Sequence, residues 1–233
     1  MSRYSLISVD LFQTLVDVNA RKYAVWQHIL GDRYSVVAAE KYWAIADELL
    51  PLHFRNAVDR SDSFPTIRSI FESMYRELFR THGVEGNPSD AADYLCYQHS
   101  LSLVYSDAIP FLKRVGAEYR ICLSSDTDLS MLGQFETLHH FDRVFTSQSL
   151  KMYKSRADGC FYRCIRDAYG LPSRQILHIG DSVADIVPAK RLGIATCWLN
   201  RNIKAWLESV KPDFQVHSLA GAAMLLGIDL GPA

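Results

Sequence analysis

The stretch ISVDLFQTLVD, residues 7–17, decides how the rest of the chain is interpreted. Its first half is a short apolar run that predicts a buried strand, and this run ends on Asp10. An acid directly after an apolar strand needs a partner to stay ionised, because burial disfavours charge. Phe12 follows two residues later, at a place where a second acid would be chemically useful. The stretch therefore predicts a functional carboxylate at the end of a strand.

Further strand-like runs lie at residues 119–125, 143–147, 175–181 and 196–200. Helical patterns precede three of them, and Gly193 ends the helix before the last run. Apolar strands that alternate with helices predict an α/β fold, a Rossmann-like parallel sheet with helices on both faces. Ligands of such sheets bind at the carboxyl ends of the strands.

The region from about Val18 to Leu103 breaks this alternation. It is rich in aromatic residues and has helical periods such as TIRSIFESMYRELFRTHG, with no convincing strand. We therefore predict an all-helical cap, residues 18–103, inserted into a catalytic core of residues 1–17 and 104–233. Aromatics at helical spacing are expected to form the insertion's own core, with a substrate cavity as the alternative. Four arginines of this region are expected to be surface charges, with recognition of a substrate acid as the alternative. They are Arg21, Arg55, Arg60 and Arg68.

The composition argues against several classes of protein. The 233 residues are 48% hydrophobic with a formal charge of -1, and no Lys/Arg cluster is interleaved with aromatics, so a small molecule rather than nucleic acid is the expected partner. No apolar run approaches the roughly 20 residues of a membrane span, and no basic flank precedes an apolar segment at the start, so we expect a cytoplasmic location. Five cysteines without a CxxC pattern predict buried thiols rather than disulfides or a zinc site. The oligomeric state is left open.

Polar residues that end the strands would converge on one edge of the sheet. They are Asp10 with Thr14, Ser125 with Asp126, Lys154, and Asp181 with Asp185. A carboxylate can attack phosphorus in line if a cation offsets its repulsion from the phosphate, and Mg²⁺ suits several oxygen ligands. Ser125 and Lys154 would then hold the equatorial phosphate oxygens.

Each of these residues also has a plainer interpretation when it is considered alone. Asp181 with Ser182 could cap a helix, Lys154 could be a solvated surface residue, and Ser125 a turn hydroxyl. Their occurrence together and in order favours the functional interpretation. His178, within a strand, is expected to be a core residue with satisfied hydrogen bonds rather than a ligand.

Four segments resemble, in order and approximate spacing, the four motifs of the haloacid dehalogenase (HAD) superfamily of hydrolases: ISVDLFQTLVD, ICLSSDTD, the YKS around Lys154, and ILHIGDSVADI. The helical insertion lies where that family has its C1-type cap. The resemblance implies ligands for Mg²⁺, namely Asp10, the backbone carbonyl of Phe12, Asp181 and Asp185. It also implies a catalytic set, namely Asp10 as the nucleophile, Thr14 to order the first loop, and Ser125 and Lys154 to bind phosphate.

Phosphatases of this family usually read D-x-D-G-T, and the second Asp is their general acid and base. Phe12 can neither donate nor accept a proton, so we expect a Mg²⁺-dependent phosphatase for a small phosphorylated metabolite that works through an aspartyl-phosphate and lacks this acid. Gln13 replaces the usual Gly and is expected to narrow the phosphate pocket. Asp126 stands where relatives often have Asn, and it would repel a dianionic substrate unless it is neutral or turned away.

Two alternatives stay open. A 2-haloacid dehalogenase also has an aromatic residue at the position of Phe12, and a halide leaves without protonation. Dehalogenases, however, replace the metal-binding Gly-Asp pair with a Ser-x-Asn arrangement, whereas this chain keeps Asp181 and Asp185. The other alternative is a non-catalytic protein of the same fold that binds metal and phosphate.

Overall fold

A computed structural model of the chain describes residues 3–59, 63–133, 141–156 and 158–231. The chain forms two compact units. The sheet unit comprises Met1–Asp17, Val104–Asp126 and Phe135–Ala233, and the helical unit comprises Val18–Leu103 and Thr127–Gln134. Two short strands, β2 (Val16–Asp17) and β3 (Leu103–Val104), pair with each other where the chain passes from one unit to the other.

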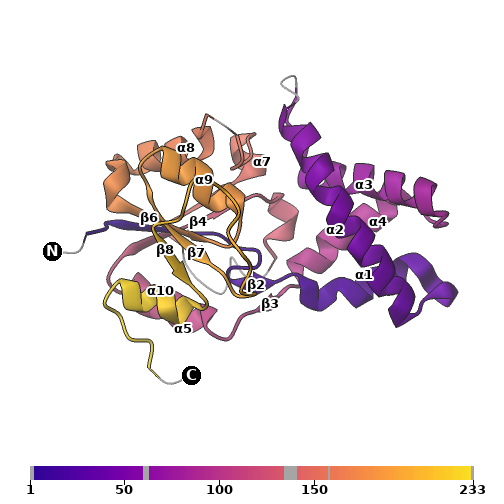
Figure 1. Cartoon of the computed structure of the whole chain (residues 1–233), viewed down its shortest axis with the longest axis horizontal. Helices are drawn as coiled ribbons and strands as arrows, with labels where there is room; N and C mark the ends of the chain where they lie inside the picture. Colours follow the sequence, from indigo (N-terminus) through magenta and orange to yellow (C-terminus); the bar gives the residue numbers. More distant parts are fainter. Residues whose placement is uncertain (1–2, 60–62, 134–140, 157, 232–233) are drawn as a thin grey trace. The chain divides into compact units, whose positions relative to one another are not determined.

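A six-stranded parallel sheet forms the centre of the sheet unit, in the order β5-β4-β1-β6-β7-β8 (Figure 1). The strands are β1 (Leu6–Val9), β4 (Arg120–Ser125), β5 (Arg143–Thr146), β6 (Ile176–Gly180), β7 (Ala195–Leu199) and β8 (Phe214–Val216). All residues of β1, β6 and β7 are buried, which explains their unbroken apolar runs. The predicted α/β fold is confirmed. Strand β8 was not predicted, because a three-residue edge strand without fully buried positions leaves no clear apolar pattern.

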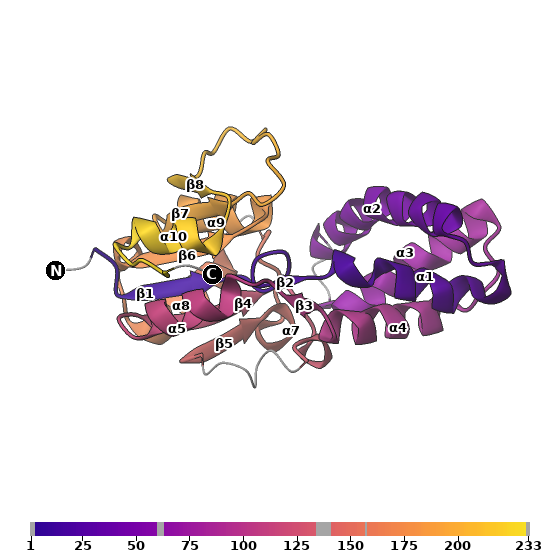
Figure 2. The same cartoon turned by 90° about the horizontal axis from the view of Figure 1, so that it is seen from below.

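Helices cover both faces of this sheet (Figures 1 and 2). On one face lie α8 (Cys160–Tyr169) and α9 (Val183–Arg191), and on the other lie α5 (Ala108–Gly116) and α10 (Leu219–Leu225). Under α8, the rings of Phe161 and Tyr162 pack with β-strand residues such as Leu6 and Ile176 in a fully buried cluster. Short elements complete the unit, namely α7 (Ser147–Leu150) and η4 (Ser173–Gln175).

Four helices make up most of the helical unit: α1 (Lys22–Leu30), α2 (Val36–Asp59), α3 (Ile67–His82) and α4 (Pro88–Ser100). Helix α3 packs against α2 and α4, and α1 packs against the same two helices. Trp26 is fully buried between Tyr42 and Tyr75, with ring centroids 5.3 and 6.0 Å away. These aromatic side chains therefore pack as the unit's own core. The short helices η1 (Asn19–Arg21) and η2 (Gly31–Arg33) flank α1.

The segment Thr127–Gln134 belongs to the helical unit, although the sequence analysis placed it in the core of residues 104–233. It contains the short helix η3 (Leu129–Met131), which packs against α4. The buried carboxylate of Asp128 accepts hydrogen bonds from the backbone N–H groups of Ile67 and Arg68, at 3.1 and 2.9 Å. These contacts attach the segment to the first turn of α3, and a contact of such long sequence separation leaves no local pattern.

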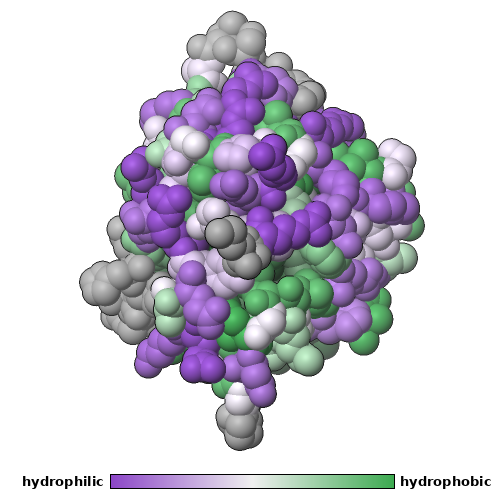
Figure 3. Space-filling view, turned by 90° about the vertical axis from the view of Figure 1, so that its left-hand side faces the viewer, coloured by the Kyte–Doolittle hydropathy of each residue, from purple (hydrophilic) through white to green (hydrophobic). Residues whose placement is uncertain are grey.

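None of the five cysteines forms a disulfide; Cys96, Cys122 and Cys197 are buried, whereas Cys160 and Cys164 are partly exposed. The surface mixes polar and apolar residues, and hydrophilic side chains predominate over much of the face in Figure 3. Within the described ranges, no helix is both long enough and apolar enough to cross a bilayer.

Candidate functional site

The carboxyl ends of β1, β4 and β6 meet in the middle of the sheet, where the strand order reverses at β1. Asp10 follows the last residue of β1, Ser125 is the last residue of β4, and Asp181 follows the last residue of β6. The Asp10 N–H donates to the carbonyl of Ile179 at 2.9 Å, so the ladder between β1 and β6 continues to the base of the predicted nucleophile. Parallel pairing therefore brings together three residues that lie far apart in the sequence.

Lys154 is the central cation of this site. Its Nζ donates to Oδ1 of Asp10 and to Oδ1 of Asp185, both at 2.6 Å, and the residue is only 2% exposed. Burial alone lowers the pKa of a lysine, but the two carboxylates outweigh that effect and hold the pKa of Lys154 above its usual value. The surface role considered for Lys154 is thus wrong, and the side chain is a permanent charge inside the site.

Asp185 is fixed by the start of α9. The Ser182 side chain caps the helix, and the Ser182 N–H and Oγ donate to Asp185 Oδ2 at 3.0 and 2.6 Å. Burial opposes its charge, yet Lys154 and His178 more than compensate, so the pKa of Asp185 lies below its usual range. A Cβ at position 180 would lie 2.3 Å from Asp185 Cγ, so only glycine allows this approach.

Asp10, Asp181 and Asp185 form the one group of three potential metal ligands found in the described parts of the chain. One carboxylate oxygen from each lies within 4.8 Å of the other two. Burial, followed by repulsion from Asp185 and Asp10, raises the pKa of Asp181 well above its usual value. Burial likewise raises the pKa of Asp10 to about 6, although Lys154 opposes the shift. Three crowded acids of this kind are a donor set that suits a hard divalent cation.

Two predicted site hydroxyls are buried without a partner. Ser125 Oγ and Thr14 Oγ1 make no hydrogen bond within the described structure. A buried hydroxyl without a partner is energetically unfavourable, so a ligand at the end of β4 would gain a donor at little cost. This feature fits the predicted phosphate contact of Ser125. Thr14 instead contributes through its backbone carbonyl, which accepts from Arg201 Nη2 at 2.9 Å.

A tight turn connects Asp10 to β2. The N–H groups of Leu15 and Val16 both donate to the carbonyl of Leu11, at 2.8 and 3.1 Å. Gln13 has a φ of +58°, in the left-handed region, and its Oε1 accepts from the Tyr105 hydroxyl at 2.8 Å. The Gln13 side-chain amide is therefore bound by Tyr105. The prediction that Gln13 narrows the phosphate pocket did not anticipate this contact. Phe12 offers no proton-transferring atom at this turn.

The Asp126 side chain is partly buried, and its pKa is raised. Its Oδ1 accepts from the backbone N–H of Lys154 at 3.0 Å, and the residue is partly buried. Burial raises the pKa of Asp126 to about 7, although Lys154 opposes this shift. A substantial fraction of the Asp126 side chains is therefore neutral near pH 7, which removes much of the repulsion expected for a phosphate dianion.

His178 is buried in β6, as predicted for a core residue, but it also contacts the site. Its Nε2 lies 3.2 Å from Asp185 Oδ1, and its Nδ1 lies 3.0 Å from the Ser8 hydroxyl. Trp198, whose Nε1 donates to the Asp181 carbonyl at 2.9 Å, supports the second acid in the same way. No local pattern predicts either contact, because His178 of β6 reaches Asp185 of α9 and Trp198 of β7 reaches the residue that follows β6.

Two of the four arginines singled out in the sequence have local partners. Arg68 binds Asp93, Glu72 and Ser89, and Arg21 donates to Gln98 at 2.9 Å. Arg55 is exposed, and Arg60 lies outside the described residues. Arg68 was expected to be a surface charge, and in the structure it joins α3 to α4 through Asp93 and Ser89.

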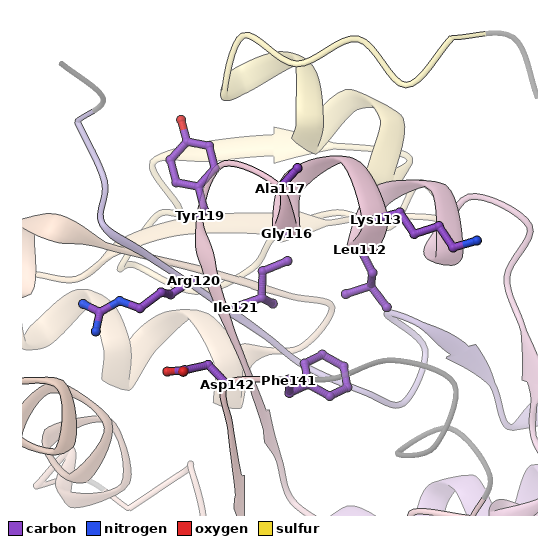
Figure 4. A pocket seen from close by; sticks show the side chains of 9 residues that line it. All are labelled: Leu112, Lys113, Gly116, Ala117, Tyr119, Arg120, Ile121, Phe141 and Asp142. Carbon is purple, nitrogen blue, oxygen red and sulfur yellow. The ribbon is translucent and has the colours of Figure 1, made fainter.

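A cavity of about 790 Å³ lies at the other end of β4 and is separate from these acids (Figure 4). Leu112, Ile121 and Phe141 are among its lining residues, and Arg120 and Asp142 extend on its polar side. Because β4 runs from Arg120 at this cavity to Ser125 at the acids, the cavity is not the candidate site.

Comparison with known proteins agrees with this architecture. Residues 157–222 match the HAD-hydrolase-like family. Over 94 residues the chain is 30% identical to the (S)-2-haloacid dehalogenase of Pseudomonas sp. strain YL, an alignment that covers 40% of each chain.

Solved structures share the fold over nearly the whole chain. YfnB from Bacillus subtilis, assigned as an HAD-hydrolase and solved with magnesium, superposes with a TM-score of 0.80 at 16% identity, covering 97% of this chain and 100% of YfnB. The L-2-haloacid dehalogenase of Xanthobacter autotrophicus with covalently bound chloropropionic acid gives 0.77 at 18% identity, covering 99% and 100%. These matches show that the chain has the fold of the HAD-hydrolase structures and that its residues 157–222 resemble the HAD-hydrolase-like family.

Proposed function

We propose that the protein hydrolyses a phosphorylated small molecule through a covalent intermediate on Asp10. The observation that carries this proposal is the cluster of Asp10, Asp181 and Asp185 around Lys154, with ligand oxygens within 4.8 Å of one another. A reaction at a neutral carbon halide gains little from three acids. Phosphoryl transfer gains directly from them, because they can hold the divalent cation that offsets the charge of the substrate.

The donor set fits Mg²⁺. Asp10, Asp181 and Asp185 would hold the ion together with the Phe12 carbonyl, the fourth ligand that the motif implies. When bound, the ion would supply positive charge for the phosphate oxygens and for the crowded carboxylates. Burial and repulsion from Asp185 and Asp10 raise the pKa of Asp181, and a divalent cation at this place would oppose that shift.

The chain's own residues then perform two displacements. An Asp10 oxygen forms a bond to phosphorus while the bond from phosphorus to the leaving oxygen breaks, and the leaving oxygen takes up a proton. Water next attacks the same phosphorus, loses a proton, and releases inorganic phosphate with Asp10 restored. Lys154 and the free hydroxyl of Ser125 bind the phosphate oxygens in both steps.

Phe12 supplies no proton for these steps, so the proton must come from another group or the leaving group must need none. We propose that Asp126 supplies it, since this carboxyl lies beside Lys154 and keeps its proton up to about pH 7. Acyl phosphates and other activated phosphates would be the substrates that depend on it least.

The second candidate is hydrolysis of a 2-haloacid. Phe12 favours it, because halide departure needs no acid, and so does the identity to a curated dehalogenase. The retained Asp181 and Asp185 oppose it. A non-catalytic protein that binds metal and phosphate ranks third, and a cytoplasmic location stays a prediction.

One set of measurements separates these candidates. Beryllofluoride with MgCl₂ should be retained by the wild type as a mimic of aspartyl-phosphate, and Asp10→Asn should abolish both retention and phosphate release. Halide release from L-2-chloropropionate that EDTA leaves unchanged would instead establish the dehalogenase. Retention of beryllofluoride without turnover of any phosphate or haloacid would support the binding protein.

A further inference from the structure

The turn after Asp10 contains a residue in an unfavourable conformation. Gln13 has a φ of +58°, which L-residues with a Cβ adopt at a cost and glycine adopts freely. Within the turn, the Gln13 backbone N–H donates to the Val16 carbonyl at 2.7 Å, and the turn's bonds to the Leu11 carbonyl do not involve the Gln13 side chain. The Gln13 side chain is instead bound by a residue from elsewhere in the fold.

Tyr105 binds the turn at two points. Its backbone N–H donates to the Leu15 carbonyl at 3.0 Å, and its hydroxyl donates to Gln13 Oε1 at 2.8 Å. Burial raises the pKa of Tyr105 to about 12, so the hydroxyl remains a donor at physiological pH. Tyr105 thus contacts the turn both at the side chain of Gln13 and at the carbonyl of Leu15.

Arg201 stacks on the Tyr105 ring and also contacts the turn. Its guanidinium carbon is 3.9 Å from the centre of the Tyr105 ring, and Nη2 donates to the Thr14 carbonyl at 2.9 Å. Asp107 orients the guanidinium through two hydrogen bonds of 3.1 and 2.8 Å. Asp107 itself accepts from the Leu219 N–H at 2.8 Å, so the arrangement is anchored to the start of α10.

We propose that Gln13, Tyr105 and Arg201 form a clamp that fixes the turn of residues 11–16 and thereby sets the direction of the Asp10 carboxylate. Tyr105 and Arg201 are positioning residues, since their hydrogen bonds are with the turn rather than with Asp10. The catalytic consequence rests on the proposed function. The stabilisation of the turn by the clamp does not depend on the proposed function, and it can be measured without any substrate.

Tyr105→Phe is the test, because it removes the hydroxyl and keeps the ring that stacks on Arg201. Amide hydrogen exchange at Gln13, Leu15 and Val16 should become about 5- to 10-fold faster, the effect of one hydrogen bond, while exchange in β1 stays unchanged. In the enzyme assay with p-nitrophenyl phosphate, kcat should fall by a similar factor, and KM should change by less than about twofold. Arg201→Lys, which keeps the charge but loses the planar fork, should give the same pattern.

A double-mutant cycle separates positioning from a general loss of stability. In Gln13→Gly the left-handed conformation no longer carries a cost and the amide acceptor is absent, so adding Tyr105→Phe should change exchange and kcat by less than about twofold. Tyr97→Phe, at an exposed tyrosine of α4, is the matched control and should leave both readouts unchanged.

The outcomes are distinct. Unchanged exchange in both Tyr105→Phe and Arg201→Lys would refute the clamp. Faster exchange with unchanged kcat, in an enzyme that needs Asp10, would refute its role in positioning. If the wild type shows no hydrolysis that depends on Asp10, the proposed function fails, and hydrogen exchange alone still decides whether the clamp holds the turn.

Discussion

At the scale of single residues, the site differs from the usual phosphatase pattern at three positions. Phe12 replaces an acid, Gln13 replaces a glycine, and Asp126 replaces an amide. In the structure, Gln13 accepts a hydrogen bond from Tyr105, and burial raises the pKa of Asp126 to about 7. The departures are therefore consistent with a modified proton path rather than with a lost site.

Restoring the acid at position 12 tests this interpretation. If Phe12 marks a missing general acid, Phe12→Asp should raise kcat for alkyl phosphates by at least about 10-fold, within the range expected of a positioned acid. p-Nitrophenyl phosphate, whose leaving group needs little protonation, should gain much less. Phe12→Asn is the control for size and polarity. If the Asp variant does not exceed the Asn variant on any alkyl phosphate, position 12 is not a vacant acid position.

Asp126→Asn tests the proposed substitute acid. The amide keeps an acceptor for the Lys154 N–H but carries no transferable proton, so kcat should fall by about 10-fold or more for alkyl phosphates. The decrease for p-nitrophenyl phosphate should be much smaller. Steady-state kinetics on both substrates gives the comparison, and an equal decrease on both would exclude Asp126 as the acid.

At the scale of elements, several helices and strands depend on side chains that come from distant parts of the sequence. The start of α3 receives Asp128 from the loop after β4, and β7 receives Asp213, the residue that precedes β8. Each case supplies acceptors to backbone N–H groups that would otherwise lack them. Local sequence accounts for these elements only in part.

Asp128→Ala should destabilise the protein measurably. It removes two charge-assisted bonds to the first turn of α3, which is worth about 1–3 kcal/mol in the free energy of unfolding. Asp128→Asn should cost less, because one acceptor remains. Urea denaturation measures both, with Asp32→Ala at an exposed position as the control. A loss no larger than that of Asp32→Ala would show that these bonds contribute nothing to stability.

Asp213 should contribute a pH-dependent part of the stability. It accepts from Thr196 N–H and Oγ1 at 2.9 and 3.1 Å and pairs with Lys190, and although burial opposes its charge these contacts lower its pKa. Because the pKa of Asp213 is lower in the folded state, its ionised side chain stabilises the protein above the ordinary aspartate pKa of about 3.9. This contribution to the free energy of unfolding is lost as the pH falls through the folded-state pKa. Thermal melts of the wild type and Asp213→Asn should therefore differ at pH 7 and converge on acidification below about pH 4. A constant difference across that range would contradict the assignment.

At the scale of the whole molecule, the parallel sheet determines which charges meet. Its strand order places the ends of β1, β4 and β6 together, and the loop before α8 brings Lys154 between Asp10 and Asp185. Three acids and a lysine in one buried place leave an excess of negative charge. Native stability should therefore respond to a divalent cation.

Millimolar MgCl₂ should raise the melting temperature of the wild type. Saturation to about 100 times the dissociation constant corresponds to about 2.7 kcal/mol of added stability. Asp181→Asn should respond far less, because it removes a carboxylate ligand, and without metal it should melt at or above the wild type, because an amide carries no charge for burial and the neighbouring acids to disfavour. Asp167→Asn, at a surface position of α8, should respond like the wild type. Equal responses in wild type and Asp181→Asn would remove Asp181 from the metal site.

The sequence by itself determined the parallel α/β sheet and predicted that the chain between β2 and β3 is mainly helical. It also indicated that Asp10, Ser125 and Asp181 lie at the ends of strands, because apolar runs and the polar residues that end them are local features. The tertiary structure decided the rest. It placed Lys154 on two carboxylates, attached Asp128 to α3, and gave Gln13 its support from Tyr105 and Arg201. Each of these contacts joins residues tens to nearly two hundred positions apart, and hydrogen-bond geometry across such separations is set by the packing of the strands and helices rather than by any local pattern.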